Sequence, residues 1–186
     1  MKVLRSEKEF GGKASVVALG MFDGVHLGHQ MLIRTAVRLA KEMGVESIVC
    51  TFDRHPLELL CPEKAPQALL SLEENIGKFE QLGADNVLVK EFTREFAGML
   101  PEDFLEALTT QLRVKAIVVG DNYSFGRQGR GNAEMVKQLA GKYGYRAKIV
   151  PPVTDAQGMI SSTRIRELLQ NGDREGAEAL MRIQEV

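Results

Sequence analysis

The sequence predicts an α/β fold, doubly wound, with a mainly parallel five-stranded sheet and helices on both faces. Five short, continuous apolar runs rich in β-branched residues recur along the chain. Such runs are typical of parallel strands that are buried on both faces. Segments with apolar residues at helical spacing alternate with the runs, and this alternation favours a doubly wound sheet. The length of 186 residues is enough for one such domain with a substantial core.

The predicted strands are Val16–Leu19, Ser47–Phe52, Asn86–Val89, Ala116–Val119 and Ala147–Val150. Helices are predicted between them. The first begins at Gln30 and carries an apolar stripe to Met43, with Gly44 in a C-cap position. The pattern Ser71-Leu72-Glu73-Glu74 is a capping box that begins a second helix, which ends at Leu82.

The remaining helices are predicted from their first residues. Pro101 suits the first turn of a helix that runs through Leu112, and Asn132 caps a helix that ends near Tyr143. After the strand that ends at Val150, Ser161 begins a helical C-terminal segment of about residues 161–183. No linker or repeat interrupts the chain, so residues 1–186 are predicted to form a single domain.

Composition narrows the class of protein. The chain is 44% hydrophobic and 26% charged, and its net charge of -1 gives no field that would attract nucleic acid or an anionic membrane. No apolar stretch approaches the roughly 20 residues that span a bilayer, and the N-terminus lacks the apolar region of a signal peptide. The two cysteines, Cys50 and Cys61, form no disulfide framework and no metal pattern. We expect a cytoplasmic protein, with no protein partner evident.

The segment Gly20–His29, GMFDGVHLGH, joins the first strand to the first helix. A strand–helix junction offers free backbone N–H groups and the positive end of a helix dipole, both of which suit a phosphate. His26 and His29 share one face of the first turn, and Gly28 leaves room for a close approach. A metal site is a weaker interpretation, because no third ligand is clear. The structural alternative is a capped turn with surface histidines.

Ser161, Ser162 and Thr163 begin the late helix with hydroxyls and free N–H groups, which predicts a second anion site. Arg164 and Arg166 add positive charge next to it. The structural alternative is a plain serine N-cap followed by solvated arginines.

Two more polar and aromatic segments follow predicted strands. Phe52, His55 and Pro56 follow the second strand, and Asn122 and Phe125 follow the fourth. Asn122 offers hydrogen-bond donors and an acceptor to the edge of a heterocycle, and Phe125 offers a flat ring. The alternatives are a structural histidine at residue 55 and a turn with one buried aromatic ring at residue 125.

Four stretches together resemble a known family. Residues 20–29, 49–56, 118–131 and 160–166 are similar, in this order, to the motifs of the FMN adenylyltransferase module of prokaryotic riboflavin kinase/FAD synthetases, which are H-x-G-H nucleotidyltransferases. The resemblance covers about residues 15–180 and implies a Rossmann-like fold. It also implies adenylyl transfer from ATP to FMN with Mg²⁺, which yields FAD and pyrophosphate.

The resemblance also implies residue roles. His26 and His29 would be catalytic, as donors that stabilise charge on the phosphates during in-line transfer. The ATP site would include Gly20, Phe22, Asp23, Gly24, Gly28, Ser161, Ser162, Thr163 and Arg166. The flavin site would include Phe52, His55, Pro56, Asn122 and Phe125. Mg²⁺ is expected to arrive on the triphosphate, so no residue is assigned as a metal ligand.

Two departures from the family pattern matter. Arg54 stands where the family more often has proline, and its effect on the acceptor site is open. Bifunctional members continue into a riboflavin kinase domain, which is expected to be absent from this chain. Two alternative functions remain. One is adenylyl or cytidylyl transfer to another phosphate acceptor, and the other is a non-catalytic module that binds flavin nucleotides.

Overall fold

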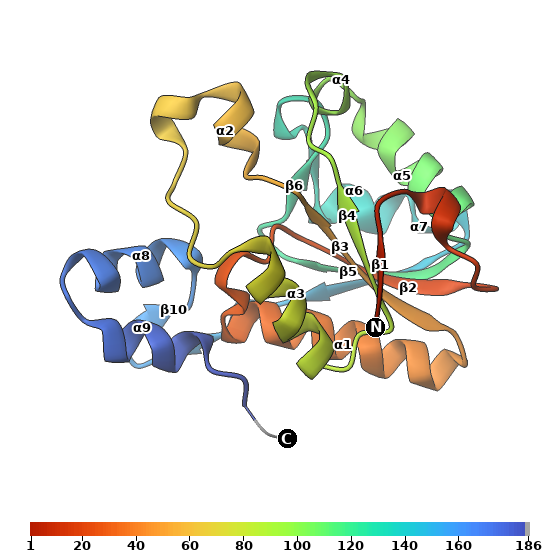
Figure 1. Ribbon diagram of the computed structural model, residues 1–186. Coiled ribbons are helices and arrows are strands. Elements are labelled where there is room, and N and C mark those ends of the chain that lie inside the picture. Colours follow the sequence, from red (N-terminus) through yellow and green to blue (C-terminus); the bar gives the residue numbers. More distant parts are fainter. Residues whose placement is uncertain (185–186) are drawn as a thin grey trace.

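A six-stranded parallel sheet with helices on both faces forms the body of the molecule (Figure 1). The computed structural model describes residues 1–184. The strand order is β1-β4-β3-β2-β5-β8, and every neighbouring pair is parallel. The strands are β1 (Lys2–Leu4), β2 (Ser15–Leu19), β3 (Glu46–Phe52), β4 (Asn86–Lys90), β5 (Val114–Gly120) and β8 (Arg146–Val150).

The predicted fold class is confirmed, but the predicted number of strands is wrong. All five predicted strands are present, and β1 adds a sixth at the edge, paired with β4. This strand has only three residues, and Lys2 and Val3 are exposed. An edge strand this short has neither a continuous apolar run nor an alternating pattern, so its sequence gives no strand signal.

The helices also match the predicted positions, with additions. They are α1 (Leu27–Met43), α2 (Pro56–Leu60), α3 (Leu72–Gln81), α4 (Arg94–Ala97), α5 (Pro101–Gln111), α6 (Ala133–Gln138), α7 (Ala140–Tyr143), α8 (Ser162–Gln170) and α9 (Arg174–Met181). The capping box at Ser71 is present at the start of α3, and Asn132 caps α6. The helix predicted from Asn132 to Tyr143 is interrupted at Leu139, just before Gly141, whose residue type weakens a helix.

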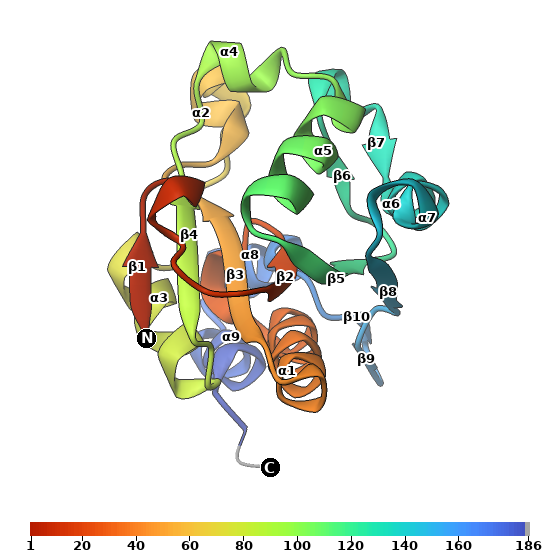
Figure 2. The same cartoon turned by 90° about the vertical axis from the view of Figure 1, so that its right-hand side faces the viewer.

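The two faces of the sheet bury separate apolar cores. Val16 and Ala18 of β2 pack with residues of α1 and α3, whereas Val17 and Leu19 pack with residues of α5 and α6. This division follows from the two-residue period of a strand, which points successive side chains to opposite faces. Figures 1 and 2 show the sheet between these two helical layers.

The order in which strands are added to the sheet changes side between β2 and β5. From β2 the order continues through β3 and β4 on one side, whereas β5 continues to β8 on the other. In open parallel sheets, ligands bind beyond the carboxyl ends of the strands at such a switch point. Here β2 ends at Leu19 and β5 ends at Gly120, so residues 20–29 and 121–126 both follow the switch-point strands.

The C-terminal helices form a third, small cluster. Ile160, Ile165, Ala177, Leu180 and Met181 are buried together in and around α8 and α9. Short paired strands β6 (Ser124–Phe125) with β7 (Gly131–Asn132), and β9 (Thr154–Asp155) with β10 (Gly158–Met159), lie outside the main sheet. Within residues 1–184, no helix has the length and apolar character needed to cross a membrane.

Candidate active site

The backbone between β2 and α1 makes a strained turn. Phe22, Gly24 and Val25 have positive φ values of 54°, 80° and 43°, in the left-handed region. This region is unfavourable for a β-branched residue such as Val25, so the surrounding structure must hold the turn. Gly24 also permits close packing, since a Cβ atom there would lie 2.8 Å from Leu69 Cδ1. The turn ends at His26, the N-cap of α1.

The two histidines of the turn stack on each other. Their ring centroids are 3.7 Å apart at an interplanar angle of 22°. His26 Nδ1 accepts a hydrogen bond from the backbone N–H of His29 at 3.4 Å, so the neutral His26 ring carries its proton on Nε2. His29 Nδ1 is buried and has no hydrogen-bond partner among residues 1–184. The turn therefore contains one N–H donor, His26 Nε2, and one buried ring nitrogen, His29 Nδ1, without a hydrogen-bond partner in the described residues.

Burial keeps both rings neutral at pH 7. Desolvation lowers the pKa of His26 to about 4. Desolvation also lowers the pKa of His29 well below its ordinary value, and the neighbouring His26 lowers it further. The pair would therefore act through neutral N–H donors and not as two cations.

The lowered pKa values predict acid sensitivity of the fold. Between about pH 6.5 and pH 4 the unfolded chain binds a proton at His26 and the folded chain does not, so stability falls as the pH falls through this window. His26 alone should reduce the free energy of unfolding by about 2 kcal/mol between pH 7 and pH 5. Urea unfolding of the wild type and of His26→Gln at both pH values measures this, and an equal pH effect in the two proteins would contradict it.

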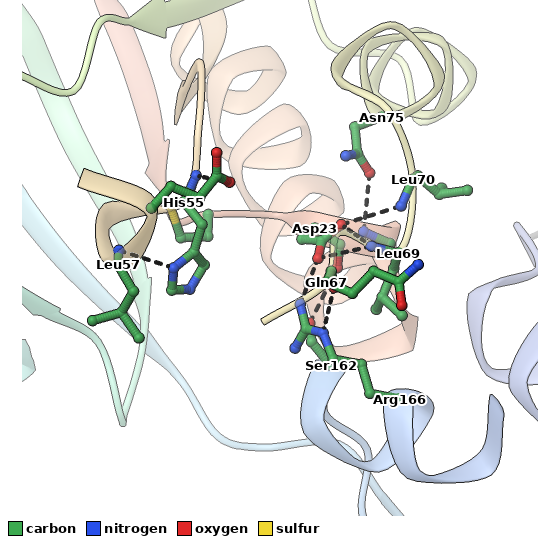
Figure 3. A network of polar contacts seen from close by, with 12 residues as sticks. Asp23, His55, Leu57, Gln67, Leu69, Leu70, Asn75, Ser162 and Arg166 are labelled. Carbon is green, nitrogen blue, oxygen red and sulfur yellow. Dashed lines mark hydrogen bonds and ion pairs between the residues drawn. The ribbon is translucent and has the colours of Figure 1, made fainter. Parts of the chain in front are cut away.

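Asp23 connects the turn to two distant segments, as Figure 3 shows. Its carboxylate accepts hydrogen bonds from the backbone N–H groups of Leu69 at 3.0 Å and Leu70 at 3.3 Å. It also pairs with Arg166 of α8, with 2.6 Å between Oδ2 and Nη2. Arg166 Nε donates in turn to the carbonyl of Gln67 at 2.7 Å. Asp23 thus joins the end of β2, the segment before α3 and helix α8.

Further contacts bring residues 20–29 and residues 160–166 together. Ser162 Oγ donates to the Asp23 carbonyl at 3.1 Å, and Ser161 Oγ caps α8 by accepting from the Arg164 N–H. A Cβ atom on Gly28 would lie 3.7 Å from the Ile160 carbonyl, so the starts of α1 and α8 approach closely. The N-termini of these two helices therefore face a common region.

A cleft lies between these helix starts and the end of β5. Its lining includes His26, Gly28, His29, Asn122, Ser161 and Ser162. Asn122, predicted at the flavin site, thus lies with the histidines. Thr163 and Arg166 line a separate groove along residues 65–69.

Two of the predicted ATP residues at the turn, Phe22 and Gly20, pack against each other. Phe22 is fully buried and packs edge-on against His29 and Phe79, so its ring supports the turn from within the core. Gly20 lies above this ring, because a Cβ atom there would be 2.9 Å from Phe22 Cζ. Phe22 and Gly20 thus shape the turn that places His26 at the start of α1.

An apolar pocket lies at the same edge of the sheet. Phe52, Pro56 and Phe125, all predicted at the flavin site, contribute to its lining. Phe125 is only 8% exposed and stacks on Tyr123, so most of its ring belongs to the core. The sequence reasoning missed most of the other lining residues, which include Leu57, Leu60, Phe92, Phe96, Met99 and Tyr123.

His55 lies outside the apolar pocket, in a polar cleft that Asp23 also lines. Its Nδ1 accepts from the Leu57 N–H at 3.1 Å and its own N–H donates to Glu58, so it caps α2. Partial burial and the charge of Arg166 lower its pKa. The structure therefore gives His55 a capping role, as its structural alternative predicted.

Arg54, the departure from the family pattern, also lines the polar cleft. Its guanidinium pairs with the neighbouring Asp53 at 3.1 Å. Asp53 is further held by the Phe92 N–H, which donates to its other oxygen at 2.8 Å. In residues 1–184 no group of three or more His, Cys, Asp or Glu side chains is placed to hold a metal ion.

Comparisons with known proteins agree with these features. A family model described as FAD synthetase matches residues 10–164. The bifunctional riboflavin kinase/FMN adenylyltransferase of Bacillus subtilis is 41% identical over 169 residues, which cover 90% of this chain and 53% of that protein. A putative bifunctional riboflavin kinase/FMN adenylyltransferase of Geobacillus thermodenitrificans is 35% identical over 182 residues, which cover 97% of each chain.

A solved structure also matches. A crystal structure described as a macrolide-efflux protein from Streptococcus pneumoniae superimposes with a TM-score of 0.83 at 32% sequence identity, covering 96% of this chain and 59% of that one. The chain spans about half the length of most curated relatives that it matches. Because the family model matches residues 10–164, which is most of the chain, the chain belongs to the FAD synthetase family.

Proposed function

We propose that this domain transfers the adenylyl group of ATP to FMN, with Mg²⁺ arriving as part of the ATP complex. An oxygen of the FMN phosphate would attack the α-phosphorus of ATP, and the bond from that phosphorus to the bridging oxygen would break to release pyrophosphate. The observation that carries the proposal is the meeting of two helix N-termini, those of α1 and α8, at one cleft.

The cleft is suited to stabilise phosphate charge. The first turns of α1 and α8 offer backbone N–H donors at positive dipole ends. His26 adds a neutral Nε2–H donor, and His29 supplies a second ring in contact with it. In-line phosphoryl chemistry needs positioning and charge stabilisation more than a protein nucleophile, so these groups match its demands.

The apolar pocket is the proposed site for the isoalloxazine ring. Phe52, Phe92 and Phe96 contact one another there, with centroid separations of 5.2–5.8 Å. Such aromatic walls suit a large, flat heterocycle. Phe52 lines both this pocket and the polar cleft that contains Asp23, so a flavin seated in the pocket can extend its phosphate toward the turn.

A panel of phosphate acceptors tests the proposed reaction. The protein is incubated with ATP, Mg²⁺ and, in parallel, FMN, a pantetheine phosphate, a nicotinate mononucleotide and a polyol phosphate. We expect FAD and pyrophosphate from FMN and no adduct from the others. Preferred adenylation of another acceptor, or tight flavin-nucleotide binding without pyrophosphate release, would replace the proposal with one of its two alternatives.

The cytoplasmic location expected from the sequence stays a prediction.

The pocket assignment predicts a selective effect of Phe52→Ala. Loss of this ring removes one wall of the apolar pocket while leaving the α1–α8 cleft unaltered. The dissociation constant for FMN should rise by about 10-fold or more, because an aromatic side chain in contact with a ligand contributes about 1–3 kcal/mol. ATP affinity should change by less than about threefold. Calorimetric titration of both ligands measures the difference, and equal losses would argue against flavin contact at Phe52.

A further inference from the structure

A buried glutamine links the catalytic turn to the end of the described chain. Gln30 on α1 is 3% exposed. Its Nε2 group donates to the carbonyl of Val25 and to the carbonyl of Arg182, each at 3.0 Å. Its Oε1 accepts from the Gln184 N–H at 3.4 Å. Since both carbonyls can only accept and the N–H can only donate, the side-chain amide fits in one orientation alone.

The segment from Met181 to Gln184 is held in place by other side chains as well. Lys78 Nζ on α3 donates to the Met181 carbonyl at 2.7 Å, and Arg34 on α1 donates to the Gln184 carbonyl. Ile183 packs against the apolar core that α1 and α3 share with the sheet. Figure 2 shows helix α9, which leads into this segment, near α1 and α3. The segment is therefore seated against both helices by three side-chain donors.

Gln30 also forms a hydrogen bond with Val25, in the strained part of the turn. Val25 is fully buried with a φ of 43°, an unfavourable conformation for a β-branched residue, and it directly precedes His26. A conformation of this kind persists only where neighbouring groups fix it. Gln30 is one such group, because it holds the Val25 carbonyl from one turn further along α1.

We propose that Gln30 is a positioning residue for adenylyl transfer: it couples the seating of residues 182–184 to the placement of His26 and His29. When the segment is seated, the carbonyl of Arg182 and the N–H of Gln184 fix the amide, and the amide then holds the Val25 carbonyl in the left-handed turn. The effect on turnover rests on the proposed function, whereas the effect on the turn itself does not.

Gln30→Met tests the positioning role, because methionine retains most of the volume and removes both donors. We expect kcat for FAD formation to fall by roughly 10- to 100-fold with KM values within about threefold, since small displacements of catalytic groups cost that much. The matched control is Thr109→Val. Thr109 is also a buried polar residue, 7% exposed, but its hydroxyl donates to carbonyls within α5, those of Leu105 and Glu106, on the other face of the sheet. Its loss should lower the melting temperature and leave kcat unchanged.

Coupling to the segment is tested by shortening the chain. Ending it after Met181 removes the Arg182 and Gln184 partners, whereas ending it after Gln184 keeps them. In the wild-type background the shorter chain should have a lower kcat. In Gln30→Met the same shortening should lower kcat little further, because the segment acts on the turn through the Gln30 side chain that this variant has already lost. Losses that multiply would overturn the coupling.

Hydrogen exchange separates this proposal from the proposed function. In Gln30→Met, backbone amides of residues 22–29 should exchange about 10-fold faster or more than in the wild type, relative to amides in β5 that stay unchanged. This result is expected even if the wild type forms no FAD, in which case the function alone fails. Unchanged exchange in the turn would overturn the positioning role of Gln30.

Discussion

Replacement of His29 by alanine is expected to lower kcat for FAD formation by about 10²- to 10³-fold, because loss of one preorganised donor at a developing charge has this effect in other enzymes. The ring stacks on His26 at 3.7 Å, and its Nδ1 has no partner in residues 1–184. Removal therefore leaves no new unsatisfied group in the fold, and the effect should concentrate on turnover. Steady-state rates of pyrophosphate release measure it.

Met31→Ala is the matched control for this experiment. Met31 lies on the same helix and is 48% exposed, so its variant should retain wild-type rates. The melting temperature of His29→Ala should stay within a few degrees of the wild type. Wild-type-like FAD formation by His29→Ala would remove the histidine pair from the mechanism.

Replacement of Asp23 by alanine should produce the largest loss of stability, about 3 kcal/mol in the free energy of unfolding. The carboxylate accepts from two backbone N–H groups and pairs with Arg166, and both side chains of the pair are at most 17% exposed. The variant leaves a poorly solvated guanidinium without its anion. ATP binding should weaken at the same time, because α8 loses its ion pair with the turn and keeps only the hydrogen bond from Ser162 to the backbone carbonyl of residue 23.

Asp155→Ala provides the comparison, because a second arginine of α8, Arg164, pairs with the carboxylate of Asp155. Asp155 accepts two hydrogen bonds of 2.8 Å from Arg164, two residues before Arg166, but the Asp155 side chain is 35% exposed. Exposed pairs contribute little, so this variant should unfold at nearly the wild-type denaturant concentration. Equal losses in the two variants would mean that the Asp23 pair has no special role in the site.

The sequence predicted the features that depend on local pattern. The strand–turn–helix around His26, the capping box at Ser71 and the N-cap at Ser161 each arise from residues within a few positions of one another. The four central strands were predicted for the same reason, since each is a buried apolar run. Local patterns thus sufficed to predict five of the six strands of the sheet and the helices that follow residues 26 and 161.

Features that depend on distant contacts could not be predicted. Asp23 and Arg166 are 143 residues apart in sequence, so their ion pair becomes visible only after folding. The pocket residues Leu60 and Phe96 belong to helices of five and four residues, too short to show helical periodicity. Asn122 and Phe125 were both predicted at the flavin site from their side-chain chemistry and the family resemblance, yet they line two different pockets, because the turn after β5 separates them.

The ion pair between Asp23 and Arg166 also bears on the entropy of ligand binding. A free arginine side chain has about 2 kcal/mol of rotamer entropy to lose when it is immobilised. Here Asp23 and the Gln67 carbonyl already orient the guanidinium through Nη2 and Nε. A nucleotide that recruits this arginine meets a side chain ordered during folding, so the cost of ordering it falls on protein stability and not on affinity.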